Sequence, residues 1–470
     1  MQPSHLNPYH IQHNLPKSMF RRYDIRGKIG IELNENAYYT LGLALGAYAK
    51  TKHETTVIVG RDGRNESPVF AKALISGLNA AGIDVVDIGL VPTPVLYFAT
   101  HHLPFCSGLM VTGSHNPKDY NGLKMVIKGQ TLASGEIQQI AKLCETNLEA
   151  SLSGSYKSQD ITEDYIAYIC KDIKLQSPPS IVLDAGNGAG GDVAVRLFKR
   201  LGCKVDALHC DIDGNFPNHH PDPSVEENLE PLIQRVKETS ADGGLALDGD
   251  ADRIGIVTNK GEIVWPDMQM MFYAMSVLTS HPSSPIVFDV KCSRHLGEWI
   301  KNHNGNPQMW QTGHSVLKAR MLELQAPLAG ELSGHIFFND DRWFGFDDGL
   351  YAGARWLEIM DQQPGTPSEA IAHLPKSFST PELKVPLDEQ DKQPVMDALQ
   401  KHAFPGALEV ITLDGVRVEY SHGWALIRMS HTTPCLTVRF EADSLAMLEQ
   451  MKSDYEALIN RMLPVPTASF

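Results

Sequence analysis

SIVLDAGNGAGG, residues 180–191, begins as a run of β-branched and apolar residues, turns at a glycine-rich stretch and leads into a helix-like segment. Two other stretches have the same order of strand, polar turn and helix: TTVIVGRDGR (55–64) and PIVFDVKCSRHL (285–296). Short apolar runs alternate with longer amphipathic ones along most of the chain, a pattern typical of βα units and of parallel or mixed sheets. The sequence therefore predicts an α/β fold.

Each of the three stretches is followed, 47 to 69 residues later, by a second strand-like run that ends in a polar loop. The loops are TGSHNP (112–117), DGDADR (248–253) and GELSGH (330–335). Open α/β sheets bind ligands at the carboxyl ends of their strands. We therefore expect three similar α/β domains that each contribute one loop to a shared site.

A segment rich in proline and charge, residues 373–393, predicts a further boundary. Three strand-like runs follow it, ALEVITLDGVRVEY (407–420), GWALIRMS (423–430) and CLTVRFEA (435–442), and then a helix over 443–462. These predict a smaller α+β domain, whose own polar loop is RMSHTTP (428–434). We expect the four domains to span residues 1–158, 159–260, 261–373 and 374–470.

The composition limits the classes of function. A chain of 470 residues that is 42% apolar and 21% charged is neither disordered nor fibrous, and its net charge of −15 argues against binding to nucleic acid or to an anionic membrane. The seven cysteines include no CxxC pair, as is typical of reduced thiols in the cytoplasm. The first twenty residues lack an apolar core, so we expect no targeting segment, and prolines interrupt the longest uncharged stretch.

The loop DGDADR places Asp248, Asp250 and Asp252 at alternate positions behind an apolar strand. Three carboxylates at this spacing suit a hard divalent cation such as Mg²⁺. An EF-hand is excluded, because its sixth and twelfth positions would be Arg253 and Asn259 rather than glycine and glutamate. A solvated acidic turn remains the alternative.

The loop TGSHNP presents Ser114 directly after a strand. It is not a hydrolase nucleophile elbow, because Thr112 and Asn116 stand where that motif needs glycines. Beside a trio of carboxylates, however, Ser114 becomes a candidate phosphoryl carrier, since a phosphoserine would supply further oxygen ligands to Mg²⁺.

The two remaining loops carry groups that suit a phosphate and a sugar. Arg428, Ser430 and Thr432 offer a guanidinium fork and hydroxyls to a phosphate, although a plain surface turn has the same residues. In GELSGH the carboxylate and hydroxyl suit sugar hydroxyls, and a core-facing histidine is the alternative for His335.

One motif indicates a different class of protein. The glycines of 186–191 match G-x-G-x-x-G, with Asp206 twenty residues beyond the first, which is the dinucleotide-binding fingerprint. An NAD-dependent oxidoreductase is therefore an alternative. It leaves the other four loops unexplained, and Asp184 stands just before the turn.

Together with RRYDIRG (21–27), VKCS (290–293), TGHS (312–315) and RWFGFDDG (342–349), these loops resemble the α-D-phosphohexomutases over nearly the whole chain. The likeness is nearest to their bacterial phosphomannomutase/phosphoglucomutase branch. The resemblance implies four domains around a central cleft and a monomeric enzyme that uses Mg²⁺. It also implies that the enzyme interconverts hexose 1-phosphate and hexose 6-phosphate through a phosphoserine and a glucose or mannose 1,6-bisphosphate. The glucosamine-specific branch, with TASHNP and GEQSGH, remains an alternative, because only Gly113 and Leu332 speak against it.

The resemblance assigns roles to individual residues. Ser114 corresponds to the phosphorylated nucleophile and, with Asp248, Asp250 and Asp252, to the Mg²⁺ ligands. Arg26 and Arg253 correspond to the arginines beside the transferring phosphoryl group. Lys124 and His115 correspond to groups suspected of proton transfer. Residues that contact the phosphosugar correspond to Tyr23, Lys291, His314, Glu331, Ser333, His335, Arg428, Ser430, His431 and Thr432.

His431 stands where this branch usually has asparagine in R-x-S-N-T-x-P. If its imidazole contacts phosphate, we expect the affinity to fall as the pH rises through about 6.5, where histidine loses its charge. The KM for sugar phosphate should then rise with pH in the natural chain and not in His431→Asn. Identical pH profiles of the two proteins would contradict a side-chain contact.

Overall fold

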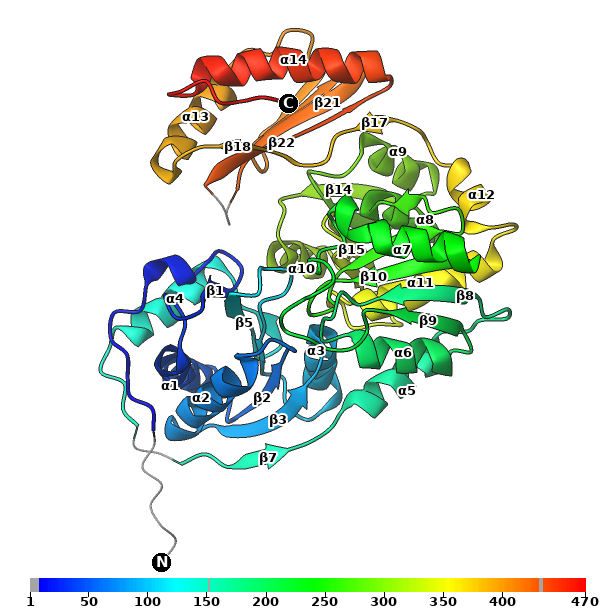
Figure 1. The fold of residues 1–470 in the computed structure, drawn as a ribbon. Coiled ribbons are helices and arrows are strands. Elements are labelled where there is room, and N and C mark those ends of the chain that lie inside the picture. The colour runs from blue at the N-terminus through cyan, green and yellow to red at the C-terminus, as the bar shows by residue number, and fades with distance from the viewer. Residues whose placement is uncertain (1–7, 151–152, 431–433) are drawn as a thin grey trace, which may run out of the picture.

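The computed structural model describes residues 8–150, 153–430 and 434–470. Four sheets follow one another along this part of the chain, with seven, five, four and six strands (Figure 1). The first three are mixed and the fourth is antiparallel. The predicted fold class, three α/β domains followed by a smaller α+β domain, is confirmed.

The elements have the following bounds. The strands of the first two sheets are β1 (Ile25–Lys28), β2 (Thr56–Arg61), β3 (Asp84–Leu90), β4 (Gly108–Val111), β5 (Tyr120–Ile127), β6 (Gln130–Thr131) and β7 (Tyr156–Ser158), then β8 (Ser180–Asp184), β9 (Lys204–Leu208), β10 (Gly243–Leu247), β11 (Ile254–Thr258) and β12 (Ile263–Val264). Those of the last two are β13 (Pro285–Asp289), β14 (Asn306–Trp310), β15 (Leu328–Gly330) and β16 (Ile336–Phe338), then β17 (Phe378–Ser379), β18 (Leu383–Pro386), β19 (Glu409–Ile411), β20 (Val416–Tyr420), β21 (Gly423–Met429) and β22 (Cys435–Ala442).

The helices lie between these strands. They are η1 (Lys17–Met19), α1 (Glu35–Thr51), α2 (Ser67–Ala80), α3 (Thr93–His102), α4 (Ser134–Cys144), α5 (Thr162–Asp172), α6 (Gly191–Arg200), α7 (Glu226–Thr239), α8 (Pro266–Ser280), α9 (Arg294–Asn302), α10 (His314–Glu323), α11 (Gly349–Gln362), α12 (Pro367–Ala372), α13 (Glu389–Lys401) and α14 (Leu445–Met462). None of these helices is both long and apolar enough to cross a membrane.

The first three sheets repeat one strand order. It reads β5-β4-β2-β3 in the first domain, β11-β10-β8-β9 in the second and β16-β15-β13-β14 in the third. In each, the last three strands are parallel and the first pairs antiparallel with its neighbour. Three of the predicted loops are the hairpin connections β4–β5, β10–β11 and β15–β16, so each begins at the carboxyl end of a parallel strand.

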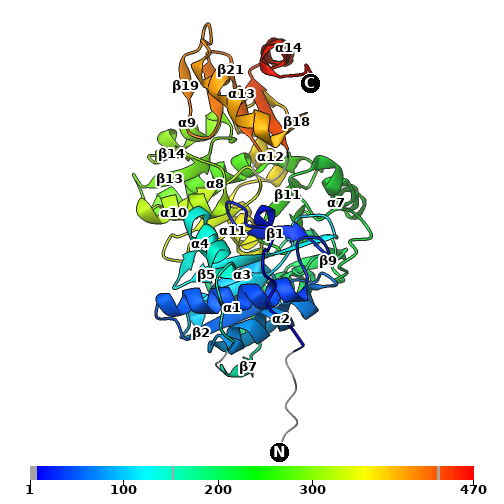
Figure 2. The same cartoon turned by 90° about the vertical axis from the view of Figure 1, so that its left-hand side faces the viewer.

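The C-terminal domain differs in detail from the prediction. The run 407–420 was expected as one strand, but it forms β19 and β20, because the chain turns at Gly415 with a φ of +86°. The helix expected from residue 443 begins at Leu445, since the side chain of Ser444 accepts a hydrogen bond from the N–H of Met447 and caps it. In both views this domain lies at the far end of the molecule from α1 and α2 (Figure 1, Figure 2).

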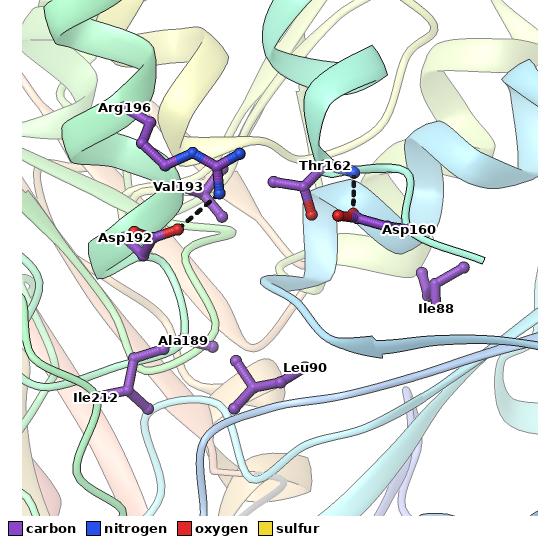
Figure 3. Close-up of a pocket in the computed structure, with 9 residues that line it drawn as sticks. All are labelled: Ile88, Leu90, Asp160, Thr162, Ala189, Asp192, Val193, Arg196 and Ile212. Atoms are coloured by element: carbon purple, nitrogen blue, oxygen red, sulfur yellow. Dashed lines mark hydrogen bonds and ion pairs between the residues drawn. The ribbon is translucent and has the colours of Figure 1, made fainter. Parts of the chain in front are cut away.

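A crevice lies between the first two domains (Figure 3). Ile88 and Leu90 of β3 form one side of it, and Arg196 of α6 forms the other, where its guanidinium is paired with Asp192 at 2.8 Å. None of the residues predicted for the functional site lines this crevice.

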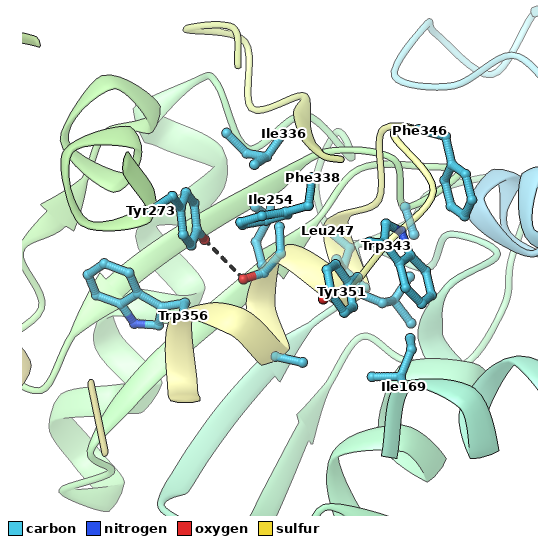
Figure 4. Packing of buried hydrophobic residues seen from close by; sticks show 14 of the residues in the cluster. Ile169, Leu247, Ile254, Tyr273, Ile336, Phe338, Trp343, Phe346, Tyr351 and Trp356 are labelled. Carbon is cyan, nitrogen blue, oxygen red and sulfur yellow. Dashed lines mark hydrogen bonds between the residues drawn. The ribbon is translucent and has the colours of Figure 1, made fainter. Parts of the chain in front are cut away.

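One apolar cluster runs through the first three domains. Phe98 of α3 packs against Tyr165 of α5 and Trp343 of the third domain, with ring centroids 5.5 and 6.4 Å apart. Figure 4 shows Trp343 stacked on Tyr351, and their ring centroids are 4.1 Å apart. The C-terminal domain has a separate cluster. The first domain also has a large cluster of its own, which includes residues of α1, α2, β4 and β5. The shared cluster therefore joins the three domains that carry the hairpin loops.

Truncating Phe98 tests this shared core. The ring is fully buried, so Phe98→Ala should lower the free energy of unfolding by about 3–5 kcal/mol, whereas the half-exposed Phe378→Ala should cost less than about 0.5 kcal/mol. Urea denaturation should also show the first three domains unfolding in one transition. A separate transition for the first domain would contradict a common core.

Candidate active site

The acidic loop between β10 and β11 is buried, not solvated. The side chains of Asp248, Asp250 and Asp252 have no exposed surface, and one carboxylate oxygen of each lies within 4.8 Å of the others. Burial and mutual repulsion raise the pKa of Asp248 and of Asp252 above the usual value. A solvated acidic turn is therefore excluded.

Lys124 of β5 projects into this loop from the first domain. Its Nζ donates to Oδ2 of Asp250 at 2.7 Å and also to Asp252. Burial would lower the pKa of Lys124, but the two carboxylates outweigh burial and raise it. Burial alone would raise the pKa of Asp250. The Lys124 ammonium outweighs that effect and holds the pKa of Asp250 below its usual value.

The carboxylate oxygens of this loop fit a hard cation. Oδ2 of Asp250 accepts hydrogen bonds from the hydroxyls of Thr93 and Thr112, at 2.6 and 3.1 Å. Oδ1 of Asp250 and Oδ1 of Asp252 are buried and accept none from the described residues. Buried carboxylate oxygens without donors are the ligands that Mg²⁺ prefers. Asp248, Asp250 and Asp252 could therefore hold this ion.

Ser114 lies against this acidic loop. Its Oγ donates to Oδ2 of Asp248 at 3.0 Å and lies 3.2 Å from Nδ1 of His115. Its φ of +46° is left-handed, which costs a non-glycine residue about 1 kcal/mol, and its N–H donates to the hydroxyl of Thr112 at 2.8 Å. The turn directs the hydroxyl towards the second domain.

Arg64, which the sequence analysis missed, holds the Ser114 loop in shape. It is 2% exposed, and its guanidinium donates to the carbonyls of Ser114, Asn116, Pro117 and Tyr120 at 2.6–3.0 Å. The signal was present, since Arg64 follows β2, whose carboxyl end lies at the same edge of the sheet as the loop.

Two further arginines approach the site from different domains. Arg26 donates to the carbonyl of Thr112 at 3.1 Å and pairs with Asp24 at 2.5 Å. Arg253 donates through Nε to Nε2 of His335 at 3.0 Å. Both guanidiniums are thus fixed by partners rather than left in solvent.

A buried histidine connects the acidic loop to the third domain. Because Nε2 of His335 accepts from Arg253, its proton lies on Nδ1, which is 3.0 Å from Oδ2 of Asp347. Lys318 pairs with the other oxygen of Asp347 at 3.0 Å. His335 is therefore buried but bound by polar partners, rather than packed only against core residues. The sequence did not indicate two of the residues in this contact, Asp347 and Lys318.

Glu331 and its neighbours form the third loop. The carboxylate of Glu331 accepts from the N–H of Gly313 and from the hydroxyl of Ser333, each at 2.8 Å. His314 begins α10, and its ring centroid lies 5.4 Å from that of His335. Burial lowers the pKa of His314 well below its usual value.

The backbone of Thr312 links three domains. Its carbonyl accepts from the hydroxyl of Tyr23 at 2.7 Å, and its N–H donates to Asp414 at 3.1 Å. Asp414 in turn accepts from Arg428 of β21 at 3.1 Å. Burial raises the pKa of Tyr23 to about 12, so this hydroxyl stays protonated.

The remaining predicted residues lie in the third and fourth domains. Nζ of Lys291 is 3.7 Å from Asp289 and 3.4 Å from Glu382. Ser430 is buried, and its carbonyl accepts from Lys392 at 2.8 Å. His431 and Thr432 lie outside the described residues, so the part of the phosphate loop that they form stays a prediction.

The glycine-rich turn that matched the dinucleotide fingerprint has another role. A Cβ on Gly188 would lie 2.7 Å from the carbonyl oxygen of Gly249, and one on Gly190 would lie 2.6 Å from Cβ of Ala251. The glycines allow the turn to pack against the acidic loop. The fingerprint is explained by protein packing, and the oxidoreductase alternative loses its support.

Comparisons with known proteins agree along most of the chain, from residue 17 to residue 458. Models of phosphoglucomutase/phosphomannomutase match in order: alpha/beta/alpha domain I over residues 17–151, domain II over 163–261, domain III over 265–378 and the C-terminal domain over 382–458. The phosphomannomutase/phosphoglucomutase of Pseudomonas putida is 48% identical over 450 residues, which cover 96% of this chain and 97% of that protein.

Two further relatives are similar to the chain. The phosphoglucomutase of Neisseria meningitidis serogroup A is 47% identical over 450 residues, covering 95% of this chain and 97% of that protein. The crystal structure of a phosphoglucomutase/phosphomannomutase family protein from Burkholderia thailandensis has 47% identity and a TM-score of 0.90, with 95% of this chain and 98% of that chain covered.

Replacing Arg64 tests its hold on the loop. A lysine has one ammonium in place of a five-donor guanidinium, so Arg64→Lys should lose hydrogen bonds to buried carbonyls and destabilise the protein by roughly 2–3 kcal/mol. Hydrogen exchange should quicken over residues 112–120. Arg196→Lys, at an exposed ion pair, is the control and should cost about 0–1 kcal/mol. Unchanged exchange in Arg64→Lys would show that the loop keeps its shape without the guanidinium.

Proposed function

Because this chain belongs to the phosphoglucomutase/phosphomannomutase family of α-D-phosphohexomutases, we propose that it reversibly interconverts hexose 1-phosphate and hexose 6-phosphate, with mannose and glucose as the sugars. Ser114 carries the phosphoryl group in this proposal, and a hexose 1,6-bisphosphate is the intermediate. The observation that supports it most directly is the 3.0 Å contact between Oγ of Ser114 and Asp248 of the buried carboxylate trio.

The first step transfers a phosphoryl group from Ser114 to the sugar. An oxygen of the free sugar hydroxyl bonds to phosphorus as the bond from phosphorus to Oγ of Ser114 breaks, and the hydroxyl proton passes to a base. His115, whose ring nitrogen lies beside Oγ, is the candidate for that base. Lys124 is an ammonium held against the acidic loop, so it is a candidate donor of the proton that the departing Oγ takes up. The bisphosphate then turns and returns its other phosphoryl group to Ser114.

Positive charge around Ser114 offsets the charge on the transferring group. Mg²⁺ at Asp248, Asp250 and Asp252 would supply a double positive charge there. Arg26 and Arg253 approach the same place from two domains, and their guanidiniums are already held by hydrogen bonds. Positioned charges of this kind need little reorganisation during the reaction.

The third and fourth loops serve the two ends of the substrate in this proposal. Glu331 offers carboxylate acceptors to sugar hydroxyls, and His314, Lys291 and Tyr23 complete that side of the site. Arg428, Ser430, His431 and Thr432 hold the phosphate that does not react. The sugar must bind in two orientations, so Glu331 must bind hydroxyls that are presented similarly in both. The 3- and 4-hydroxyls meet this requirement, and glucose and mannose have them in common.

The glucosamine-specific alternative is less well supported. Its TASHNP loop would put a methyl group at position 113, where a Cβ would lie 2.2 Å from Nε of Arg64. That guanidinium is already committed to the carbonyls of the same loop. We also propose that the enzyme is a cytoplasmic monomer.

The phosphoserine is tested by Ser114→Ala. This variant should lose nearly all mutase activity and, after incubation with hexose 1,6-bisphosphate, should not gain the mass of a phosphoryl group that the natural chain gains. Ser333→Ala, at a position outside the transfer step, should keep the phosphoserine and weaken substrate binding only. Full turnover by Ser114→Ala would refute the covalent mechanism.

The substrate assignment is tested by comparing the activity of the natural chain on mannose, glucose and glucosamine 1-phosphates. A preference for glucosamine 1-phosphate would refute the assignment.

A further inference from the structure

Three side chains of the second domain converge outside the site described above. Asp184 ends β8, His209 directly follows β9, and His219 lies in the connection between β9 and α7. Nε2 of His219 is 3.0 Å from Oδ2 of Asp184, and Nδ1 of His209 is 3.4 Å from Oδ1 of the same carboxylate. One ligand-type atom of each lies within 4.8 Å of the other two.

The hydrogen bonds around His219 aim its second nitrogen at the carboxylate. Nδ1 lies 3.0 Å from the carbonyl oxygen of His220, which can only accept, so Nδ1 carries a proton. Without a metal, Nε2 donates a hydrogen bond to Oδ2 of Asp184 at 3.0 Å, and a metal ion would displace that proton and take the lone pair of Nε2. A second-shell carbonyl on the other ring nitrogen is typical of histidines that bind metals.

His209 presents a second nitrogen to the same carboxylate. Its Nδ1 is buried and has no hydrogen-bond partner among the described residues. Its φ of +48° is left-handed, and its carbonyl accepts from the N–H of Asn187 at 2.7 Å, so the backbone is fixed with the ring beside Asp184.

The spacing of these atoms suits one ion. Ligands bound to a tetrahedral Zn²⁺ at 2.0–2.1 Å are separated from one another by about 3.3–3.5 Å. The nitrogen of His219 lies 3.0 Å from Oδ2 of Asp184 and that of His209 lies 3.4 Å from Oδ1, both close to this separation, and one ligand atom of each of the three residues lies within 4.8 Å of the other two. Two imidazoles and one carboxylate suit zinc, whereas the all-oxygen trio of the acidic loop suits Mg²⁺.

We propose that Asp184, His209 and His219 form a second metal site, which takes Zn²⁺ or a similar transition-metal ion with water as the fourth ligand. The neighbouring thiol of Cys210 is not a ligand, because it donates to the carbonyls of Leu183 and Leu208. The imidazoles are 19% and 12% exposed, so an ion can reach them from solvent.

A metal here would fasten the glycine-rich turn at residues 185–191. Asp184 stands immediately before that turn, and His209 binds its backbone at Asn187. The N–H of Ala189 donates to the carbonyl of Gly249 at 2.9 Å, so the same turn supports the acidic loop. The second site would therefore stabilise the neighbourhood of the first without touching substrate.

The proposal is tested by titrating the full chain with Zn²⁺ in a calorimeter, with excess Mg²⁺ present to fill the acidic loop. The natural chain should bind one more Zn²⁺ than His209→Phe, or bind it at least about tenfold more tightly. His281→Phe is the matched control, because His281 faces Asp341 at 3.3 Å as an exposed pair with no second imidazole, and it should bind as the natural chain does.

Cobalt gives an independent reading. Co²⁺ bound to two imidazoles and a carboxylate should show visible absorption bands in the natural chain and in His281→Phe, and these should be missing from His209→Phe. If His209→Phe does not fold, His209→Asn suits the left-handed backbone and serves instead. Equal Zn²⁺ binding and equal Co²⁺ spectra in all variants would overturn the proposal and leave the cluster as a histidine–aspartate ion pair.

Discussion

The carboxylates of Asp248, Asp250 and Asp252 are buried within one turn, and their mutual repulsion has to be offset by groups from outside the loop. Two such charges 4 Å apart repel by about 4 kcal/mol at the effective dielectric constant of a protein. The compensating donors come from the first domain, with Lys124 on Asp250 and Asp252 and the hydroxyl of Thr93 on Asp250. The acidic loop is therefore complete only when the first two domains are packed together.

The repeated sheet explains how the chain brings such loops together. In each of the first three domains the functional loop is the hairpin that joins a parallel strand to the antiparallel strand beside it. The loops leave equivalent positions of three similar sheets, and one apolar cluster fixes those sheets relative to one another. Contacts such as the bridge between Arg253 and His335 follow from that packing, because each partner is the last residue of its loop.

The sequence predicted what is local and missed what depends on docking. The strand-and-loop repeat and the spacing of the three aspartates are local, and the structure contains both. The partners of Arg64 and Asp347 lie in other loops and elements, and no periodicity indicates which of them will meet. The glycine-rich turn indicated a dinucleotide site for a related reason. Glycines that allow a backbone to approach a pyrophosphate also allow it to approach another loop, and here they pack against the acidic loop. Tyr23 and Thr312 are 289 residues apart, and only domain packing brings them together.

The last domain is attached differently from the first three. Its apolar contact with the third domain is a small cluster around Trp424, while its main core is separate. Arg417 donates to the carbonyls of Val290 and Cys292, and Arg439 donates to the carbonyl of Lys291, at 2.6–2.7 Å. Water can replace such hydrogen bonds more readily than it can replace buried apolar surface. Because these bonds hold the backbone of Lys291 itself, the position of the last domain and the placement of Lys291 in the site are set by the same contacts.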